Sequence, residues 1–388
     1  MSYLNVTEIE SALVNLQAAY PQTSELVTLP HLSHEGRQTH VLRIGAQGSG
    51  DTDGVLLLGG VHAREWVPPD ALVSLAADLL EAHQLGTGLV YGGQSFTADD
   101  VRQIVERVNL FVYPCVNPDG RSYSQTTSPM WRKNRRPPSG GAACVGVDIN
   151  RNFDFLWDHT VHFAADSHVQ TSSDPCDPQV YRGPSSASEP ETQNVVWLAD
   201  TYPRIRWHVD VHSAVPDILY SWGSDENQSA HPDQNFLNPA FDGVRGRPHD
   251  AAYGEYIEPD DLDRVRTLAD RMHDAIRAVR GDSYGVEQAY SLYPTSGASD
   301  DYAASRSRAR PDVAEIDAFT IECGHSFQPT WAEAENVIRE VSAGLVALGV
   351  AAASTIGSDE PPVPSANSIA LVRQMPGWAS IPVAAADG

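Results

Sequence analysis

The sequence is poor in lysine and in positive charge. Its 388 residues include 26 Lys or Arg against 51 Asp or Glu, which gives a formal net charge of −25, and Lys133 is the only lysine. A surface of this sign repels nucleic-acid phosphates, so the composition argues against a nucleic-acid partner. A cationic substrate would instead be attracted to it.

Long apolar runs and cysteines are also scarce. No apolar run approaches the ~20 residues that cross a bilayer, so we expect no membrane partner. Four cysteines without CxxC spacing exclude a disulfide-built scaffold. The first residues lack a basic segment followed by an apolar one, so no signal peptide is expected. This favours a cytoplasmic location, unless an export segment has been removed.

Strand and helix patterns alternate along the chain, which predicts an α/β fold. We expect a single domain over residues 1–355, with a central mixed, largely parallel twisted sheet flanked by helices. Residues 356–388 are rich in Pro, Ser and Ala and are expected to form a loosely packed extension. Strands are predicted at 41–44, 55–58, 110–113, 205–211 and 318–321, a turn at 117–120, and helices beginning near Thr7, Pro68, Ser188, Asp260 and Thr330.

Polar side chains gather where the predicted strands end. His62 and Glu65 follow one strand, Asn117 follows a second, His212 ends a third and Glu322 ends a fourth. Open α/β sheets bind their ligands outside the carboxyl ends of the strands. These residues therefore mark the expected functional edge of the sheet.

The pair His62 and Glu65 has the spacing of two metal ligands. An imidazole nitrogen and a carboxylate oxygen both suit zinc, and a second histidine such as His212 would complete a set that leaves one position open. Taken alone, HxxE also arises by chance, and a lone buried histidine is more often simply hydrogen-bonded. The short motif needs support from the rest of the chain.

Six segments together provide that support. They are GGVHAREW (59–66), NPDG (117–120), WRK (131–133), GVDINRN (146–152), VHS (211–213) and FTIE (319–322). In this order they resemble the zinc metallocarboxypeptidases of the pancreatic carboxypeptidase A/B type, from about Tyr3 to about Gly349. The resemblance implies the carboxypeptidase A-like fold, one Zn²⁺ ion as cofactor, and peptide or protein C-termini as substrates.

The resemblance also implies the catalytic roles. His62, Glu65 and His212 match the zinc ligands, and Glu322 matches the general base for the water that zinc activates. Arg132 matches the residue that stabilises the oxyanion, which a permanently charged guanidinium does well.

Further positions match the family's substrate-binding residues. Asn150 and Arg151 correspond to the clamp for the terminal carboxylate, because a planar guanidinium meets a carboxylate through two hydrogen bonds. Tyr293 corresponds to a mobile tyrosine that closes over the substrate. The remaining matches are Asp148, which orients a ligand histidine, and the subsite positions Arg64 and Phe327.

Substrate preference is expected to depend on Asp300. In the family this position lies at the bottom of the pocket for the terminal side chain, and an acidic residue there suits Lys or Arg. A buried carboxylate without a cation is costly, so Asp300 predicts a basic terminal residue. Two alternatives stay open at this point, because the Asp-Asp pair could be shifted by one residue or could cap a turn.

Other positions bear on compartment and on cleft shape. Cys144 and Cys176 lie where the family carries a disulfide, which would imply an oxidising compartment and hence secretion. The chain departs from the pancreatic pattern at Ala214, at Gly324 and His325, and in a longer stretch at 223–260.

Three functional hypotheses follow. The first is a zinc exopeptidase that removes C-terminal residues, with a preference for Lys or Arg or with a broader specificity that accepts apolar ends. The second is an amidase acting on cell-wall peptides or on branched glutamyl peptides, which predicts a changed carboxylate clamp. The third is a catalytically silent zinc-binding or peptide-binding module, which would normally have lost a ligand or the base.

Overall fold

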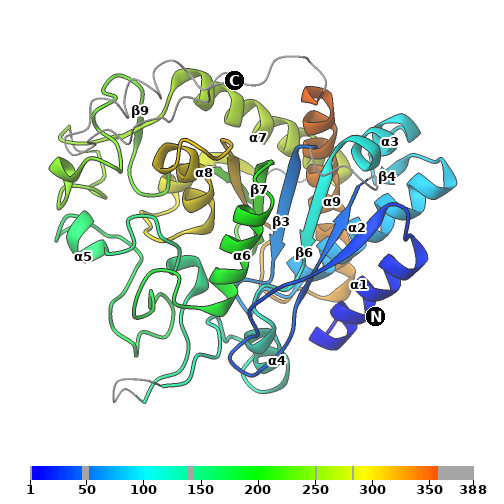
Figure 1. Ribbon diagram of the computed structural model, residues 1–388, viewed down its shortest axis with the longest axis horizontal. Coiled ribbons are helices and arrows are strands. Elements are labelled where there is room, and N and C mark those ends of the chain that lie inside the picture. The colour runs from blue at the N-terminus through cyan, green and yellow to red at the C-terminus, as the bar shows by residue number, and fades with distance from the viewer. Residues whose placement is uncertain (1, 46–51, 139–142, 250, 282–283, 357–388) are drawn as a thin grey trace, which may run out of the picture.

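An eight-stranded sheet runs through the molecule in the order β1-β2-β6-β3-β7-β12-β8-β11 (Figure 1). The computed structural model describes residues 2–45, 52–138, 143–249, 251–281 and 284–356. The four central strands β6, β3, β7 and β12 are parallel, so the expected mixed, largely parallel sheet is confirmed. The strands are β1 Ser24–Thr28, β2 His40–Ile44, β3 Gly54–Gly59, β4 Leu89–Tyr91, β5 Gln94–Phe96, β6 Asn109–Tyr113, β7 Ile205–His212, β8 Asp217–Tyr220, β9 Asn227–Gln228, β10 Glu255–Tyr256, β11 Gly285–Gln288 and β12 Asp317–Glu322.

Helices cover both faces of this sheet. Buried residues of α2, α3, α7 and α9 share one apolar cluster with one face, and residues of α6 and α8 share a second cluster with the other. Figure 1 shows α6 and α9 on opposite sides of the strands. The helices are α1 Val6–Ala19, α2 Val67–Leu85, α3 Ala98–Arg107, α4 Pro118–Thr126, α5 His159–His162, α6 Pro190–Thr201, α7 Pro259–Arg280, α8 Ser299–Ala309 and α9 Trp331–Thr355.

Strand β7 carries a different chemistry on each of its faces. Trp207, Val209 and Val211 belong to the cluster with α2 and α9. Because alternate residues of a strand point to opposite faces, His208, Asp210 and His212 face the side of α6 and α8. All three are buried. The strand thus delivers a row of polar side chains into the interior near α8.

Several element boundaries differ from the sequence expectation. Helix α1 was expected to begin near Thr7, but Asn5 caps it and forms a capping box with Glu8, so the helix begins at Val6. The predicted turn at 117–120 is the start of α4, because the Asn117 side chain accepts a hydrogen bond from Gly120 N and caps that helix. Asp260 lies in the first turn of α7 and does not cap it.

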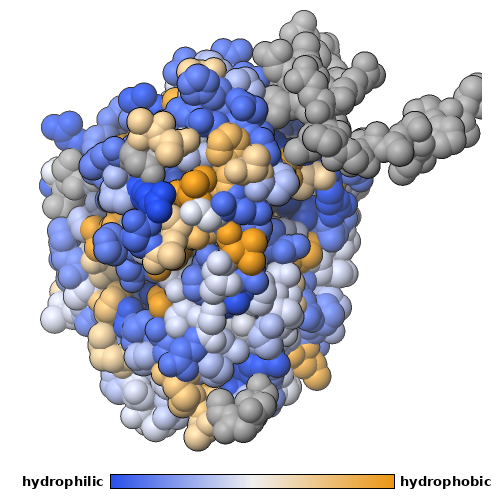
Figure 2. Space-filling model, turned by 90° about the vertical axis from the view of Figure 1, so that its left-hand side faces the viewer, coloured by the Kyte–Doolittle hydropathy of each residue, from blue (hydrophilic) through white to orange (hydrophobic). Residues whose placement is uncertain are grey.

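Helix α9 bears on the membrane expectation. Its 25 residues include a window of mean hydropathy 1.5, which is long and apolar enough to cross a bilayer, but 72% of that window is buried inside the fold. The face at the left of Figure 1 is mostly hydrophilic, with hydrophobic residues in small groups (Figure 2). The helix therefore serves as a core element here. The extension expected at 356–388 lies outside the described residues from 357 onward.

Candidate active site

The three predicted metal ligands meet at the carboxyl edge of the sheet. His62 and Glu65 lie between β3 and α2, and His212 is the last residue of β7. His62 Nδ1 is 2.9 Å from Glu65 Oε1, and His212 Nδ1 is 3.0 Å from His62 Nδ1 and 3.1 Å from Glu65 Oε2. All three side chains are buried. Residues 147 positions apart in sequence thus present their donor atoms to one point.

The segment after β3 is shaped by a glycine and an asparagine. Gly60 has φ +67°, and a Cβ there would lie 3.0 Å from Pro69 Cγ and 3.2 Å from Pro114 O. Asn117 is fully buried and donates from Nδ2 to Val61 O. Only glycine suits the first position, and the asparagine holds the chain just before His62. Asn117, expected at this edge, is therefore placed as a support for the ligand segment.

Asp148 holds the outer nitrogen of His62 and also binds Arg132. Its Oδ1 lies 3.1 Å from His62 Nε2, and its Oδ2 accepts hydrogen bonds from Arg132 Nε at 3.1 Å and Nη2 at 2.9 Å. Burial opposes ionisation of Asp148, but Arg132 and His62 outweigh it and hold its pKa well below the usual range. Arg132 Nη1 makes no hydrogen bond to a described residue. The guanidinium is thus fixed by two nitrogens and offers the third.

Asp210, which the sequence analysis did not identify, occupies the matching place beside His212. Its Oδ2 lies 3.0 Å from His212 Nε2, at ion-pair distance rather than in hydrogen-bond geometry. The same oxygen accepts a 2.6 Å hydrogen bond from Ser299 Oγ. The available signal was the strict alternation of polar residues (Arg206, His208, Asp210 and His212) with apolar ones along this strand.

The donor set fits a zinc ion. Two imidazole nitrogens and a carboxylate at mutual distances near 3 Å need a shared cation or proton between them. Burial opposes the charge of both Glu65 and His212, yet their partners prevail: His62 and His212 lower the pKa of Glu65, while Asp210 and Glu65 raise that of His212 well above its usual value. Two histidines and one glutamate leave one zinc coordination position free.

Glu322 lies beside this cluster at the end of β12. Its Cα is paired with that of His212 across the parallel strands β12 and β7. Burial and then the charge of Glu65 raise the pKa of Glu322 to about 7. A cation bound by the three ligands would favour its carboxylate form. The side chain stays partly exposed, so it can meet a substrate.

The residues expected to bind a terminal carboxylate lie together on a short 3-10 turn, Ile149–Arg151. Asn150 donates its backbone N–H to Asp148 Oδ1 at 3.0 Å and accepts at its own Oδ1 from Ser299 N at 2.8 Å. The Arg151 guanidinium carbon lies 5.9 Å from the centre of the Tyr293 ring. The clamp residues and the mobile tyrosine of the family pattern are therefore neighbours.

Asp300 lies in the first turn of α8 and is 4% exposed. Its Oδ1 accepts from Asp301 N at 2.9 Å and its Oδ2 from Thr320 Oγ1 at 3.0 Å. Among the described residues it has no ion-pair partner. Both oxygens of Asp301 instead accept from Gly223 N, and burial followed by Asp300 raises the pKa of Asp301 well above its usual value. The two adjacent carboxylates thus have different surroundings.

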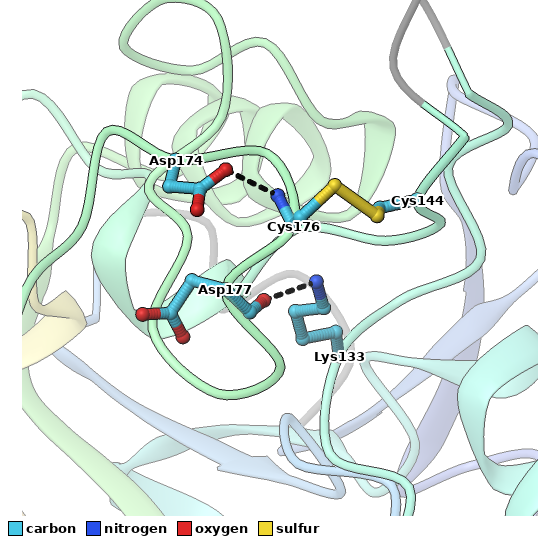
Figure 3. Close-up of a disulfide and its surroundings, with 5 residues drawn as sticks. All are labelled: Lys133, Cys144, Asp174, Cys176 and Asp177. Carbon is cyan, nitrogen blue, oxygen red and sulfur yellow. Dashed lines mark hydrogen bonds between the residues drawn. A yellow bond between two sulfur atoms is a disulfide. The ribbon is translucent and has the colours of Figure 1, made fainter.

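A disulfide fastens the loops beside Arg132. Cys144 and Cys176 are bonded, and Figure 3 shows Lys133 directing its ammonium group toward the same loop, where Nζ donates to Asp177 O at 2.7 Å. Two residues further on, Gln179 accepts from Arg64 Nη1 at 2.8 Å. The guanidinium of Arg64 also lies 4.3 Å from the Phe327 ring centre. The crosslinked loop therefore contacts Arg64 directly, and Arg64 in turn packs on Phe327.

Comparisons with known proteins agree on one family. The family model described as zinc carboxypeptidase matches residues 9–343. Carboxypeptidase B of Astacus astacus is 29% identical over 78% of this chain and 82% of its own length. Carboxypeptidase A2 of Rattus norvegicus is 29% identical over 78% of this chain but only 59% of its own length, so this chain spans little more than half of that relative.

Solved structures show the same fold. Bovine thrombin-activatable fibrinolysis inhibitor, in complex with tick carboxypeptidase inhibitor, has a TM-score of 0.68 at 20% identity, covering 92% of this chain and 99% of its own. Carboxypeptidase A from Helicoverpa armigera has a TM-score of 0.67 at 23% identity, covering 92% and 75%.

Proposed function

Because the chain belongs to the zinc carboxypeptidase family, we propose that it hydrolyses the C-terminal bond of peptides, with a preference for terminal Lys or Arg. The observation that carries the hydrolytic part is the meeting of His62, Glu65 and His212 beside Glu322. His62, Glu65 and His212 would hold one zinc ion. When bound, zinc supplies a Lewis acid and lowers the pKa of a water toward ~7.

Glu322 serves as the general base in this proposal. Its carboxylate lies at the edge where the ligands end, and a cation held by those ligands would keep it in the form that accepts a proton. It takes a proton from the attacking water and passes it to the leaving amine. Arg132 directs its free Nη1 toward the oxygen of the scissile carbonyl, where negative charge develops. Asp148 keeps that guanidinium from turning away.

The proposed clamp selects a chain end. Arg151 and Asn150 bind the terminal carboxylate, and Tyr293 covers it from the side of Arg151. A guanidinium pairs with both oxygens of a free carboxylate, which an internal peptide bond lacks. This accounts for exopeptidase activity. The presence of all three residues also disfavours the amidase hypothesis, which predicts a changed clamp.

Asp300 supports the preference for a basic end. It is a buried carboxylate with two hydrogen bonds but no cation among the described residues. A substrate ammonium or guanidinium would supply the missing charge, and removing one partner of such a buried pair costs a few kcal/mol.

The test is hydrolysis of blocked dipeptides ending in Arg, Lys, Phe or Glu by the parent, Asp300→Ala and the control Asp312→Ala, an exposed carboxylate beyond α8. We expect kcat/KM of Asp300→Ala for Arg and Lys to fall about 100-fold, with Phe changed less than threefold. An unchanged profile would remove Asp300 from the pocket. Comparable cleavage of Arg and Phe by the parent would establish the broad-specificity alternative. No cleavage of any substrate by the zinc-loaded parent would refute the carboxypeptidase proposal.

A further inference from the structure

A buried carboxylate of β7 joins the metal site to the substrate-binding elements. Asp210 is fully buried and contacts His212 Nε2 and Ser299 Oγ through one oxygen, Oδ2. Its Oδ1 has no hydrogen-bond partner among the described residues. Within that part of the chain, His212 is also its only ion-pair partner. Burying the Asp210 carboxylate is costly unless its charge interacts favourably with the adjacent His212 ring.

Ser299 contributes a second set of contacts. Its backbone N–H donates to Asn150 Oδ1 at 2.8 Å while its hydroxyl donates to Asp210 at 2.6 Å. It is also the first residue of α8 and precedes Asp300. One residue thus touches the proposed carboxylate clamp and the partner of a metal ligand, and directly precedes the specificity residue.

We propose that Asp210 and Ser299 act as a pair of positioning residues for His212. Asp210 fixes the orientation of the His212 ring, so that Nδ1 faces His62 and Glu65. Ser299 fixes Asp210 relative to the clamp and the pocket. Partners of ligating histidines commonly set ring orientation and ligand basicity. The inference rests on the proposed function, since it takes His212 as a zinc ligand.

The geometry favours this role over simple packing. Asn at position 210 would have nearly the same shape, so a packing role would survive Asp210→Asn. The substitution would, however, remove the negative charge that faces His212 Nε2. Ser299→Ala would leave Asp210 charged but free to turn. Asp210→Asn therefore tests the charge of the carboxylate, and Ser299→Ala tests the hydroxyl that holds this carboxylate in place.

The experiment compares Asp210→Asn and Ser299→Ala with two controls. Asp78→Asn changes a half-buried carboxylate of α2 that accepts a hydrogen bond from Tyr91. Ser305→Ala removes a buried hydroxyl of α8 that, within the described residues, donates only to Tyr302 O of its own helix. Zinc release into excess chelator is measured without substrate, together with the visible spectrum of the Co²⁺-loaded protein, kcat and KM. We expect about 10-fold faster release and about 10-fold lower kcat for Asp210→Asn, with KM within twofold.

Ser299→Ala should show about threefold effects in the same direction, and the controls should match the parent. Zinc release and a cobalt spectrum like those of the parent in Asp210→Asn would overturn the proposal. If Asp210→Asn does not fold, Ser299→Ala decides, since parent-like release by that variant also overturns it. A parent that binds zinc but cleaves no C-terminus contradicts the proposed function, whereas the release comparison still tests the positioning role.

Discussion

The two histidines proposed to bind zinc have carboxylate partners that are neutralised in different ways. Asp148, behind His62, contacts the Arg132 guanidinium through two hydrogen bonds and a backbone N–H through a third. Asp210, behind His212, receives one neutral hydroxyl and keeps one oxygen without a partner in the described chain. The distances to the two rings are nearly equal, 3.1 and 3.0 Å.

This difference shows that similar local geometry serves two purposes. Asp148 connects His62 to Arg132, the residue proposed to stabilise the oxyanion, and the Arg132 guanidinium balances the charge of this carboxylate. Asp210 connects His212 to α8 and the proposed clamp, and His212 is its ion-pair partner among the described residues. The contacts of Asp148 should therefore contribute more to stability, and those of Asp210 should depend more on the bound metal.

The largest effect is expected from Asp148→Asn. The substitution strands the buried Arg132 guanidinium and releases His62, so we expect kcat/KM to fall about 1000-fold and stability to fall by about 3 kcal/mol. Substrate hydrolysis and urea unfolding check it. Asp210→Asn strands no arginine and should lose less stability. Equal stability losses in the two variants would contradict the comparison.

Arg132→Met should make the two sides alike. Asp148 would remain beside His62 but lose its cation, and the proposed oxyanion donor would be gone. We expect kcat to fall about 100-fold with KM within threefold, since the donor acts on charge that develops during the reaction. Steady-state kinetics and zinc release measure both parts. If zinc release quickened as much as it does in Asp210→Asn, Arg132 would have to be reassigned to metal retention.

Metal removal should affect the two sides unequally. Chelation is expected to lower the melting temperature by about 5 °C, because the buried ligands lose their shared cation. Hydrogen exchange should rise more at the start of α8 than at residues 147–152, where Arg132 still balances Asp148. Scanning calorimetry and exchange mass spectrometry test this. Uniform exchange across both segments would count against the asymmetry.

The smallest effect concerns Glu255 of β10, a fully buried carboxylate that is not hydrogen-bonded to Arg245. Tyr253 donates a hydrogen bond to Glu255, but burial raises the pKa of Glu255 to about 7. Asp148 behaves in the opposite way, because Arg132 lowers its pKa. Arg245, Tyr253 and Arg308 face it and only partly offset burial.

A raised folded-state pKa means that stability is lost as pH rises from about 4.5 to about 7. Glu255→Gln removes this loss, so the variant should gain on the order of 3 kcal/mol over the parent at pH 8 and nothing at pH 4. Urea unfolding at several pH values measures the difference. A gain that is the same at both pH values would exclude titration of Glu255 as the cause.

Much of the fold could be predicted because the central strands are apolar and because strand and helix patterns alternate along the chain. Strand β3 is buried throughout, and a continuous apolar run shows this directly. The edge strands β1 and β11 were missed because short half-exposed segments show weak periodicity, and β8 was missed because it has only four residues. Helix α3 was missed although Thr97 and Asp100 form its capping box and its buried residues recur at helical spacing. The start of α4 was taken for a turn because Asn117 and Pro118 favour both a turn and a helix start.

The site was predictable only as far as motifs extend. Short segments of recognisable pattern contain five of the site residues, namely His62, Glu65, Asp148, His212 and Glu322. Asp210 lies in a strand of alternating polarity, and nothing in sequence shows that Ser299, 89 residues away, donates to it. Such pairings depend on how α8 packs against the sheet, which no local pattern encodes.

The chain's single lysine has a practical consequence. Lys133 is 3% exposed, and its Nζ is engaged by the carbonyl of Asp177 beside the disulfide. Burial also lowers the pKa of this amine, but water and reagents cannot readily reach it. Amine-directed dyes, biotin esters and lysine crosslinkers therefore find no accessible side-chain target on the folded protein. A lysine introduced on any chosen surface would become the single accessible side-chain amine for such reagents.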